Sequence, residues 1–348
     1  MPRRPRKLSF GRVFQRSVNA LTRATLRSGS RVVSRAVRQA GTQVAKQQAR
    51  RQLPTSAHGS WLAGIAVGHG GARRYQLFRP AGAAAPLPLL VMLHGCNQDA
   101  AGFARSTRLH TLALREGFML LYPEQERLAN AQGCWSWFET RSGRAFAEAG
   151  SILAAIDQAC TLHGADPTRV AVAGFSAGAG MAALLALRHP ERFQAVVMHS
   201  GVAPGAAHST ATALGAMQGR RRPTPLEAGV QLPPLLAIQG NVDSVVARSN
   251  ARAAVELWAG ASGARERAPR RLQRGARHAM TLTDFKRAGQ TMATLCDIER
   301  LGHAWSGGAA GQPYSDPAGP DAGRLAWSFA ARCFDRRAAH LLQSAAKQ

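Results

Sequence analysis

Negative charge is scarce in this chain and is missing altogether from its first part. The 348 residues include 45 Lys and Arg against 19 Asp and Glu, which gives a formal net charge of +26. No Asp or Glu precedes Asp99, whereas residues 1–52 carry fourteen Lys and Arg. The positive charge of this segment favours binding to an anionic surface, either a membrane or a polymer inclusion. The alternative interpretation is a basic tail that stays in solution. Nucleic-acid binding would rest on the arginine content alone, and we do not predict it.

Long apolar runs and closely spaced cysteines are also lacking. No stretch approaches the roughly 18 apolar residues that a membrane-spanning helix needs, and arginines interrupt every candidate core of a signal peptide. We therefore expect a cytoplasmic or inclusion-associated protein. The five cysteines include no CxxC pair and no Cys/His cluster with zinc-like spacing. The sequence predicts neither a metal site nor an organic cofactor.

What is present divides the chain into two unequal parts. Residues 1–57 are predicted to form a basic extension that is partly helical or disordered, and Pro54 lies in its linker-like end. Its apolar residues recur at helical steps of three and four, namely Phe10, Val13, Phe14, Val18 and Leu21. Residues 58–340 are predicted to form one catalytic domain, because the composition, 45% hydrophobic, is sufficient for a substantial core.

In that second part, apolar runs alternate with helical segments. The predicted strands are Leu89–His94, Phe118–Tyr122, Arg169–Ala173, Ala195–His199 and Leu235–Gln239. The predicted helices are Ser106–Glu116, Gly150–His163, Ala177–Arg188 and Ser249–Ala259. Continuous apolar strands separated by helices indicate an α/β fold with a doubly wound, mostly parallel sheet. Ala279–Arg300 reads instead as a hairpin near the sheet edge, and Arg265–Arg277, with six arginines, as an exposed loop.

The pentapeptide Gly174–Gly178 carries the strongest chemical signal. It follows an apolar strand and precedes a helix rich in small residues, which is the setting of a nucleophile elbow. A sharp strand-to-helix turn leaves little room for flanking side chains, and it exposes the hydroxyl of Ser176 above the sheet edge. Ser176 is therefore the predicted nucleophile.

A serine hydroxyl needs a histidine base, and the histidine needs a carboxylate that orients it. In doubly wound hydrolases the chain order is Ser, then Asp or Glu, then His. Asp243 follows an apolar strand and a glycine, and His303 lies between Gly302 and Trp305 beyond another strand. The alternative for Asp243 is an ordinary turn or N-cap residue. Asp297 lies closer to His303 in sequence, but it falls inside the predicted strand.

The oxyanion of such a reaction needs two backbone donors. The amide of Ala177, directly after the nucleophile, is one candidate. The amide of Cys96, in the loop after the strand Leu89–His94, is the other, and an ordinary tight turn is the alternative reading of that loop. We expect His94 to hold this loop in place rather than to act as a base.

Tryptophans cluster in the segment Gly133–Phe138 and next to the proposed base. Trp135 and Trp305 are the candidate substrate-binding residues, because aromatic side chains in loops line grooves for apolar or aromatic acyl groups. The alternative is that these rings only seal an edge of the core.

Six motifs together resemble the poly(3-hydroxybutyrate) depolymerase family of esterases, which also includes relatives acting on feruloyl and acetyl esters of plant polysaccharides. They are Leu93–Asp99, Tyr122–Gln125, Gly133–Phe138, Gly174–Gly178, His199–Gly201 and Gly302–Gly308. The resemblance implies an α/β-hydrolase fold, a triad of Ser176, Asp243 and His303, and an oxyanion loop at Cys96. It also implies a Cys96–Cys134 disulfide in oxidising conditions. Similar proteins are often extracellular.

The expected activity is hydrolysis of carboxylic esters through an acyl-serine intermediate. The first substrate expectation is polyhydroxybutyrate or hydroxybutyrate oligomers, and the second is feruloyl or acetyl esters of polysaccharides. A different class of function also stays open, that of a non-catalytic protein on the surface of polymer inclusions. The chain departs from the family at Ala179, where a third glycine is common.

Overall fold

The structure, a computed structural model, describes residues 53–54, 58–68, 70–84 and 86–345. The predicted amphipathic helix and its anionic partner surface fall on residues 1–52, outside this part. Within the described residues, none of the helices combines the length and apolar character that crossing a bilayer requires.

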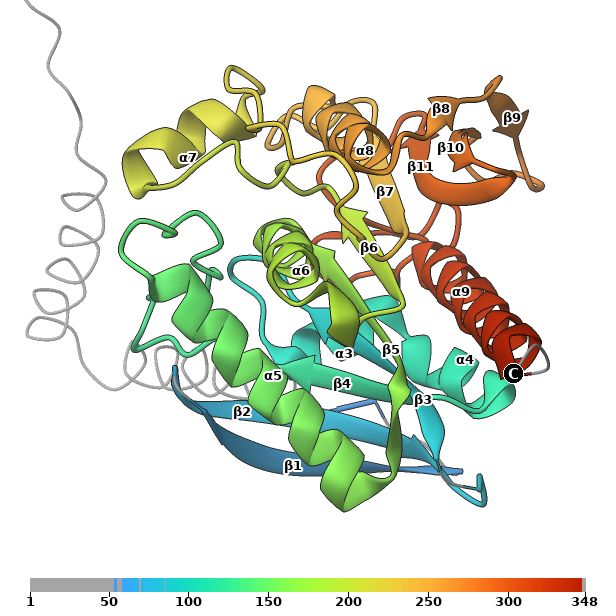
Figure 1. Cartoon of the computed structure of the whole chain (residues 1–348). Helices are drawn as coiled ribbons and strands as arrows, with labels where there is room; N and C mark the ends of the chain where they lie inside the picture. Colours follow the sequence, from blue (N-terminus) through green and yellow to red (C-terminus); the bar gives the residue numbers. More distant parts are fainter. Residues whose placement is uncertain (1–52, 55–57, 69, 85, 346–348) are drawn as a thin grey trace, which may run out of the picture. The chain divides into compact units, whose positions relative to one another are not determined.

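Most of the described chain is organised around one sheet of eleven strands (Figure 1). The strands are β1 Gly59–Gly68, β2 Gly71–Pro80, β3 Leu87–Leu93, β4 Met119–Pro123, β5 Ala165–Phe175, β6 Ala195–His199, β7 Leu235–Gly240, β8 Arg265–Glu266, β9 Arg270–Leu272, β10 Met280–Arg287 and β11 Gln290–Ile298. Their order is β1-β2-β4-β3-β5-β6-β7-β11-β10-β8, and β9 pairs with β10. The strands from β4 to β11 in this order are parallel, and antiparallel pairs border them on both sides. A short second sheet joins β12 Trp305–Ser306 to β13 Ser315–Asp316.

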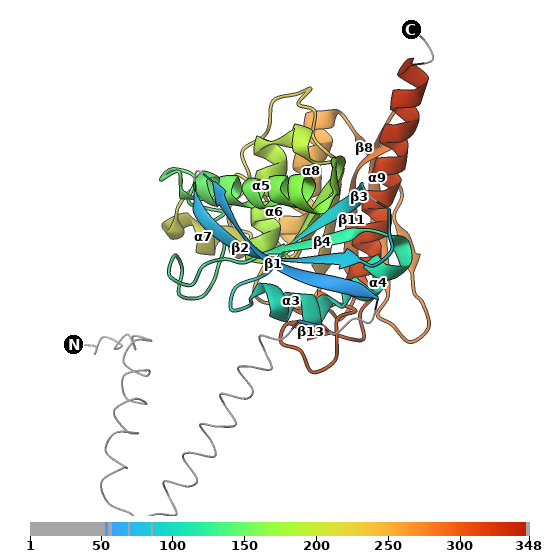
Figure 2. The ribbon, with the colours of Figure 1, turned by 90° about the horizontal axis from the view of Figure 1, so that it is seen from below.

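Helices cover both faces of the large sheet (Figure 2). They are α3 Ala100–Thr107, α4 Leu109–Glu116, α5 Arg144–His163, α6 Ala177–Arg188, α7 Thr210–Met217, α8 Ser249–Ser262 and α9 Ala322–Ala345, with a 3-10 turn η1 at Pro190–Arg192. Alternate residues of β3 enter opposite cores: Leu89, Val91 and Leu93 face α5, α6 and α8, whereas Leu90 and Met92 face α3, α4 and α9. A strand buried on both faces explains the unbroken apolar runs in the sequence.

The predicted α/β-hydrolase fold is confirmed, with differences in detail. The predicted helix Ser106–Glu116 is two helices, because Arg108 adopts a left-handed conformation with φ 51° and ends α3. The hairpin predicted within Ala279–Arg300 is present as β10 and β11 near the sheet edge. The prediction of a loop for Arg265–Arg277 is wrong in part, since β8 and β9 add exposed edge strands to β10.

Candidate active site

Ser176 stands at the sharp turn from β5 into α6. Its φ of 55° lies in the left-handed region, which is strained for a residue with a side chain. A Cβ on Gly174 would lie 2.2 Å from the carbonyl carbon of Gly178, and a Cβ on Gly178 would lie 2.2 Å from the oxygen of Leu93. Only glycine fits at both positions, because the opposing atoms belong to the backbone and cannot turn away.

Replacement of Gly178 by alanine tests this close packing. We expect the free energy of unfolding to fall by more than about 2 kcal/mol, since the methyl group would push the helix away from β3. Gly260 in α8 is a matched control, because a Cβ there meets open space and Gly260→Ala should leave stability equal or raise it by up to about 1 kcal/mol. Urea unfolding of both variants provides the measurement. Equal stabilities would contradict the packing argument.

The structure brings the three predicted side chains together. Nε2 of His303 lies 2.9 Å from Oγ of Ser176, and Nδ1 of His303 lies 2.9 Å from Oδ2 of Asp243. The Asp243 side chain is fully buried and that of His303 is 10% exposed. The hydroxyl therefore meets the edge of an imidazole whose other nitrogen is bound to a carboxylate.

Asp243 is also held by groups other than the histidine. Its Oδ1 accepts hydrogen bonds from the amides of Val245 and Val246, both at 2.9 Å, and Gln239 Nε2 donates to its Oδ2 at 3.1 Å. Burial by itself would raise the pKa of Asp243, but the hydrogen bonds from His303 and from the two amides outweigh it and hold this pKa below its usual value. The carboxylate is therefore charged and fixed in orientation. The sequence did not point to Gln239, which looks like one more strand residue before the glycine.

His199, at the end of β6, supports the segment that carries His303. Its Nε2 accepts a hydrogen bond from the amide of Ser306 at 3.1 Å, and its ring stacks on Trp305. Burial, helped by the neighbouring His303, lowers the pKa of His199 to about 3. The ring is consequently neutral, as an acceptor must be. The only sequence signal for this role was the His199–Gly201 motif.

The loop after β3 lies directly against the nucleophile elbow, since Gly178 packs on the backbone of Leu93 and His94. Gly95 N donates to Gln98 Oε1 at 2.8 Å and Asn97 N donates to Gln132 O at 2.7 Å, which fixes the loop on both sides of Cys96. Among the described residues, the amides of Cys96 and Ala177 donate to no other protein group. Two free donors thus remain in the two segments predicted to form the oxyanion hole.

His94 ties this loop to the strand beside it, in agreement with its expected structural role. Its Nδ1 donates to Gly95 O at 2.8 Å, and its Nε2 accepts from Gln125 N at 3.1 Å. Burial is the main reason why the pKa of His94 falls to about 4. A neutral ring satisfies both bonds, whereas a protonated ring would lose the second.

The two buried histidines predict a pH dependence of stability. Their folded pKa values of about 4 and about 3 lie below the ordinary value of 6.5, so between these values the unfolded chain binds more protons than the folded one. The free energy of unfolding is therefore expected to decrease as the pH falls from 7 to 4, by about 3 kcal/mol for His94. Urea unfolding over this range measures the slope, and His94→Gln should reduce it. A flat profile would show that neither ring is held neutral.

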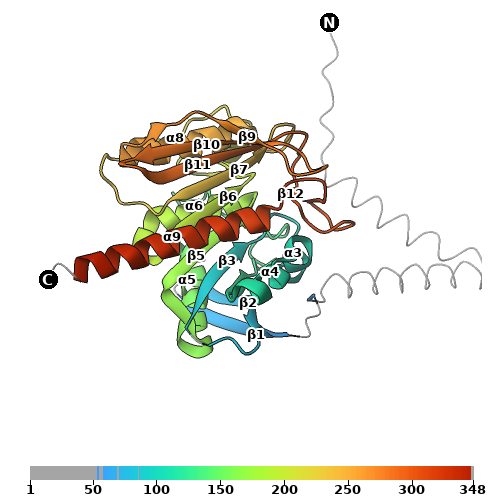
Figure 3. The same ribbon diagram turned by 90° about the vertical axis from the view of Figure 1, so that its right-hand side faces the viewer.

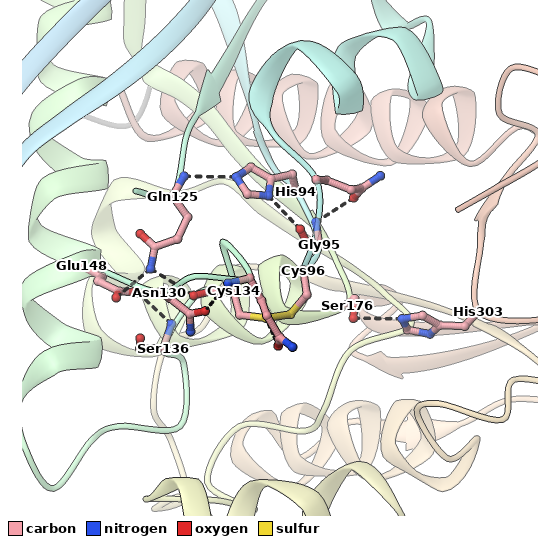
Figure 4. Close-up of a disulfide and its surroundings, with 12 residues drawn as sticks. His94, Gly95, Cys96, Gln125, Asn130, Cys134, Ser136, Glu148, Ser176 and His303 are labelled. Atoms are coloured by element: carbon pink, nitrogen blue, oxygen red, sulfur yellow. Dashed lines mark hydrogen bonds between the residues drawn. A yellow bond between two sulfur atoms is a disulfide. The ribbon is translucent and has the colours of Figure 1, made fainter. Parts of the chain in front are cut away.

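Cys96 and Cys134 form a disulfide across 38 residues of sequence, as the family resemblance implied. Figure 4 shows it between the side chains of Ser176 and His303 on one side and those of Gln125 and Glu148 on the other. Gln125 Nε2 donates to Glu148 Oε1 at 2.8 Å and to Cys134 O at 3.1 Å. The disulfide thus joins the loop predicted to supply an oxyanion donor to a second loop, in which the Ser136 amide donates to the buried carboxylate of Glu148 at 2.8 Å.

The predicted substrate contacts of the two tryptophans are corrected by the structure. Trp135 is 0% exposed and Trp305 is 1% exposed, so neither ring presents a surface to a substrate. Trp135 packs on His94 and under the guanidinium of Arg73, and Trp305 packs on Phe103 and His199. Both rings seal the core beneath the site. Burial of a large aromatic ring is favourable, so both rings pack into the core although the sequence predicts loops at both positions.

Exposed apolar side chains lie near the candidate catalytic residues in the sequence. Val242 and Val245 flank Asp243 and are 58% and 44% exposed, and Tyr314 is 38% exposed between β12 and β13. Tyr314 also lies near Phe175 of the elbow, with ring centroids 6.5 Å apart. In the described chain, no cluster of His, Cys, Asp and Glu is arranged to hold a metal ion.

The sequence is similar to several characterised esterases. It is 37% identical over 144 residues to poly(3-hydroxyalkanoate) depolymerase C of Paucimonas lemoignei, covering 40% of this chain and 33% of that protein. It is 34% identical over 128 residues to feruloyl esterase B of Neurospora crassa, covering 35% of this chain and 43% of that protein. The chain thus spans about a third to two fifths of the length of these curated relatives.

Solved structures and a family model extend the likeness. The acetyl xylan esterase from Aspergillus awamori superposes with a TM-score of 0.60 at 21% identity, over 70% of this chain and 94% of that one, which shows a shared fold. Residues 73–269, more than half of the chain, match the model of the family described as esterase PHB depolymerase. The chain belongs to this esterase family of the α/β-hydrolase superfamily.

Proposed function

We propose that this protein is a serine esterase that hydrolyses carboxylic esters through an acyl-serine intermediate. Family membership supports ester hydrolysis. The observation that carries the mechanism is the pair of 2.9 Å contacts that link Ser176 to His303 and His303 to Asp243. Nucleophilic acyl transfer requires a hydroxyl hydrogen-bonded to an imidazole, and that imidazole hydrogen-bonded to a buried carboxylate.

In the first half of the reaction, Ser176 Oγ attacks the carbonyl carbon of the ester while His303 Nε2 takes the hydroxyl proton. The carbonyl oxygen becomes an oxyanion, which the amides of Cys96 and Ala177 bind. The carbon–oxygen bond to the alcohol then breaks, and His303 returns the proton to the leaving oxygen. Asp243 accepts the hydrogen bond from Nδ1 and stabilises the imidazolium that forms in between.

In the second half, water takes the place of the alcohol. His303 removes a proton from the water, the hydroxide oxygen attacks the acyl carbon, and the same two amides bind the new oxyanion. The bond to Ser176 Oγ breaks as His303 reprotonates it. The products are a carboxylic acid and an unchanged enzyme, and no cofactor enters the sequence of steps.

Polyhydroxybutyrate or its oligomers are the proposed substrates. The similarity to a poly(3-hydroxyalkanoate) depolymerase supports this class. The exposed apolar side chains Val242, Val245 and Tyr314 beside the site also suit an aliphatic polyester better than a charged ester. They replace the two buried tryptophans as the proposed substrate contacts.

Feruloyl or acetyl esters of polysaccharides are the second candidate, because relatives with those names match at similar identity. A substrate panel separates the two: polyhydroxybutyrate granules, hydroxybutyrate oligomers, methyl ferulate and acetylated xylan. Release of hydroxybutyrate from the first two alone is the expected result. Turnover of methyl ferulate or acetylated xylan alone would replace the proposed substrate with the second candidate.

The remaining alternative is a non-catalytic protein of inclusion surfaces. Hydrolysis of p-nitrophenyl butyrate decides between this role and an enzyme, because that small ester requires only the acyl-transfer machinery. We expect turnover by the full chain. A protein that binds granules and hydrolyses neither this ester nor any member of the panel would have the alternative role.

A further inference from the structure

A second cleft lies away from the serine, beside the helix α9. α9 packs against β5, β6 and β7, and a cavity of about 880 Å³ remains between it and the strands β9 and β10. Figures 1 and 3 both show α9 alongside this end of the sheet. Among the described residues, the lining includes none of Ser176, Asp243 and His303. The cleft is therefore a site separate from the proposed catalytic centre.

Apolar side chains from the sheet and from α9 contribute to the lining of this cleft. Leu236 of β7 and Met280 and Leu282 of β10 form its sheet side, and Leu325 and Trp327 form its helix side. Its volume falls within the roughly 300 to 1,000 Å³ of small-molecule sites. The volume and the apolar side chains on both sides thus suit a hydrocarbon chain.

The rim of the cleft is strongly basic. Six arginines line it, namely Arg270, Arg274, Arg277, Arg324, Arg332 and Arg336. Three acidic residues are also present, and each is already engaged: Glu116 with Arg115, Asp284 with Arg270, and Asp321 with the backbone amide of Arg324. Six arginines against three carboxylates leave a net positive charge at the rim.

Three of these arginines lack a partner. Within the described chain, the side chains of Arg274, Arg324 and Arg332 form no hydrogen bond or ion pair. On α9, Arg332 and Arg336 are four residues apart, a spacing at which like charges destabilise a helix, and Arg324 lies eight residues before Arg332. An anion bound between the arginines would relieve this repulsion.

We propose that this cleft binds a carboxylate that carries an extended apolar chain. The carboxylate lies between Arg324 and Arg332, and the chain lies along Leu282 and Leu325. The proposal deepens the proposed function, on which it rests for the choice of anion, because hydrolysis of any carboxylic ester releases a carboxylate. The rim arginines disfavour the two other occupants, a second copy of the chain and its own basic residues 1–52, through like-charge repulsion.

Calorimetric titration of the full chain with dodecanoate, below its micelle concentration, tests the proposal. We expect a saturable site on the wild type whose affinity is at least about tenfold lower in the double variant Arg324→Gln/Arg332→Gln, which loses two charge-assisted contacts. Arg287→Gln is the matched control, since Arg287 is an exposed arginine of β10 that does not line the cleft. Binding to residues 1–52 is common to all three proteins and cancels in the comparison.

Three results would overturn the proposal. The first is equal affinity of the wild type and the double variant for dodecanoate. The second is equal binding of dodecyltrimethylammonium, which has the same chain and the opposite charge. The third is a dimeric wild type and a monomeric double variant in sedimentation, because a second copy would then cover the cleft.

Two further measurements separate this proposal from the proposed function. Ser176→Ala should bind dodecanoate as tightly as the wild type, and the double variant should hydrolyse p-nitrophenyl butyrate at the wild-type rate. Tight binding without esterase activity would leave the cleft proposal intact and remove the proposed function. Esterase activity without a dodecanoate site would do the reverse.

Discussion

Replacement of Ser176 by alanine is expected to lower kcat for p-nitrophenyl butyrate by about 10⁴- to 10⁶-fold. Without Oγ, no acyl-enzyme can form, and only the oxyanion donors and substrate binding remain to accelerate attack by water. The wild type should release a burst of p-nitrophenol equal to the enzyme concentration when deacylation is slow, and the variant should release none. Stopped-flow absorbance measures both quantities.

The variant must be compared at equal fold stability. Ser176 already has a positive φ, and alanine has the same backbone preference as serine there, so the urea midpoint should stay close to that of the wild type. A fluorophosphonate ester provides an independent readout, since it should add mass to the wild type and leave the variant unlabelled. Labelling of the variant, or unchanged kcat, would assign the nucleophile to another residue.

Replacement of Asp243 by asparagine is expected to have the second largest effect, a decrease in kcat of about 10⁴-fold. The carboxylate accepts the Nδ1 proton of His303 at 2.9 Å, which leaves Nε2 free to take the serine proton. Asparagine can present its NH₂ group to Nδ1 and so favour the opposite tautomer, in which Nε2 carries the proton. The amides of Val245 and Val246 still bind the side-chain oxygen, so the loop should keep its conformation.

Asp297 offers a matched control for this prediction. It is the neighbouring carboxylate in β11, opposite Gln239 of β7 in the register, and its Oδ2 is paired with Arg248. Asp297→Asn should therefore change kcat by less than about threefold, with some loss of stability from the broken ion pair. A large effect at Asp297 and a small one at Asp243 would reverse the proposed roles. The ratio of the two kcat values is the deciding quantity.

Local sequence patterns were sufficient to predict the central elements of the fold. β6 and α6 begin and end at the predicted residues, and β7 extends only one residue further. These segments are unbroken apolar strands or a small-residue helix bounded by glycine and proline, so neighbouring residues decide their conformation. The same holds for the turn at Ser176 only in part, because the steric exclusion at Gly174 arises within five consecutive residues, whereas that at Gly178 comes from the backbone of Leu93 in β3.

The outer elements depend on long-range contacts, which the spacing of residues in the sequence does not reveal. The β1–β2 hairpin forms ten matched residue pairs, although its glycines and its exposed Ile65 and Val67 show no strand-like pattern and no strand was predicted there. β8 and β9 are short, mainly charged segments that become strands only because β10 lies beside them. α9 gains its buried face from the sheet. In each case the decisive partner is far away along the chain.

The sequence alone determined the α/β order of elements, the elbow with Ser176, and the short set of candidates that included Asp243 and His303. The tertiary structure decided that these three side chains meet, that Gln239 and His199 support them, and that Trp135 and Trp305 are buried. It also placed the arginines of α9 opposite those that follow β9. The physical reason is range: steric and hydrogen-bonding preferences act between neighbours in sequence, whereas burial and charge depend on which distant segments share a space.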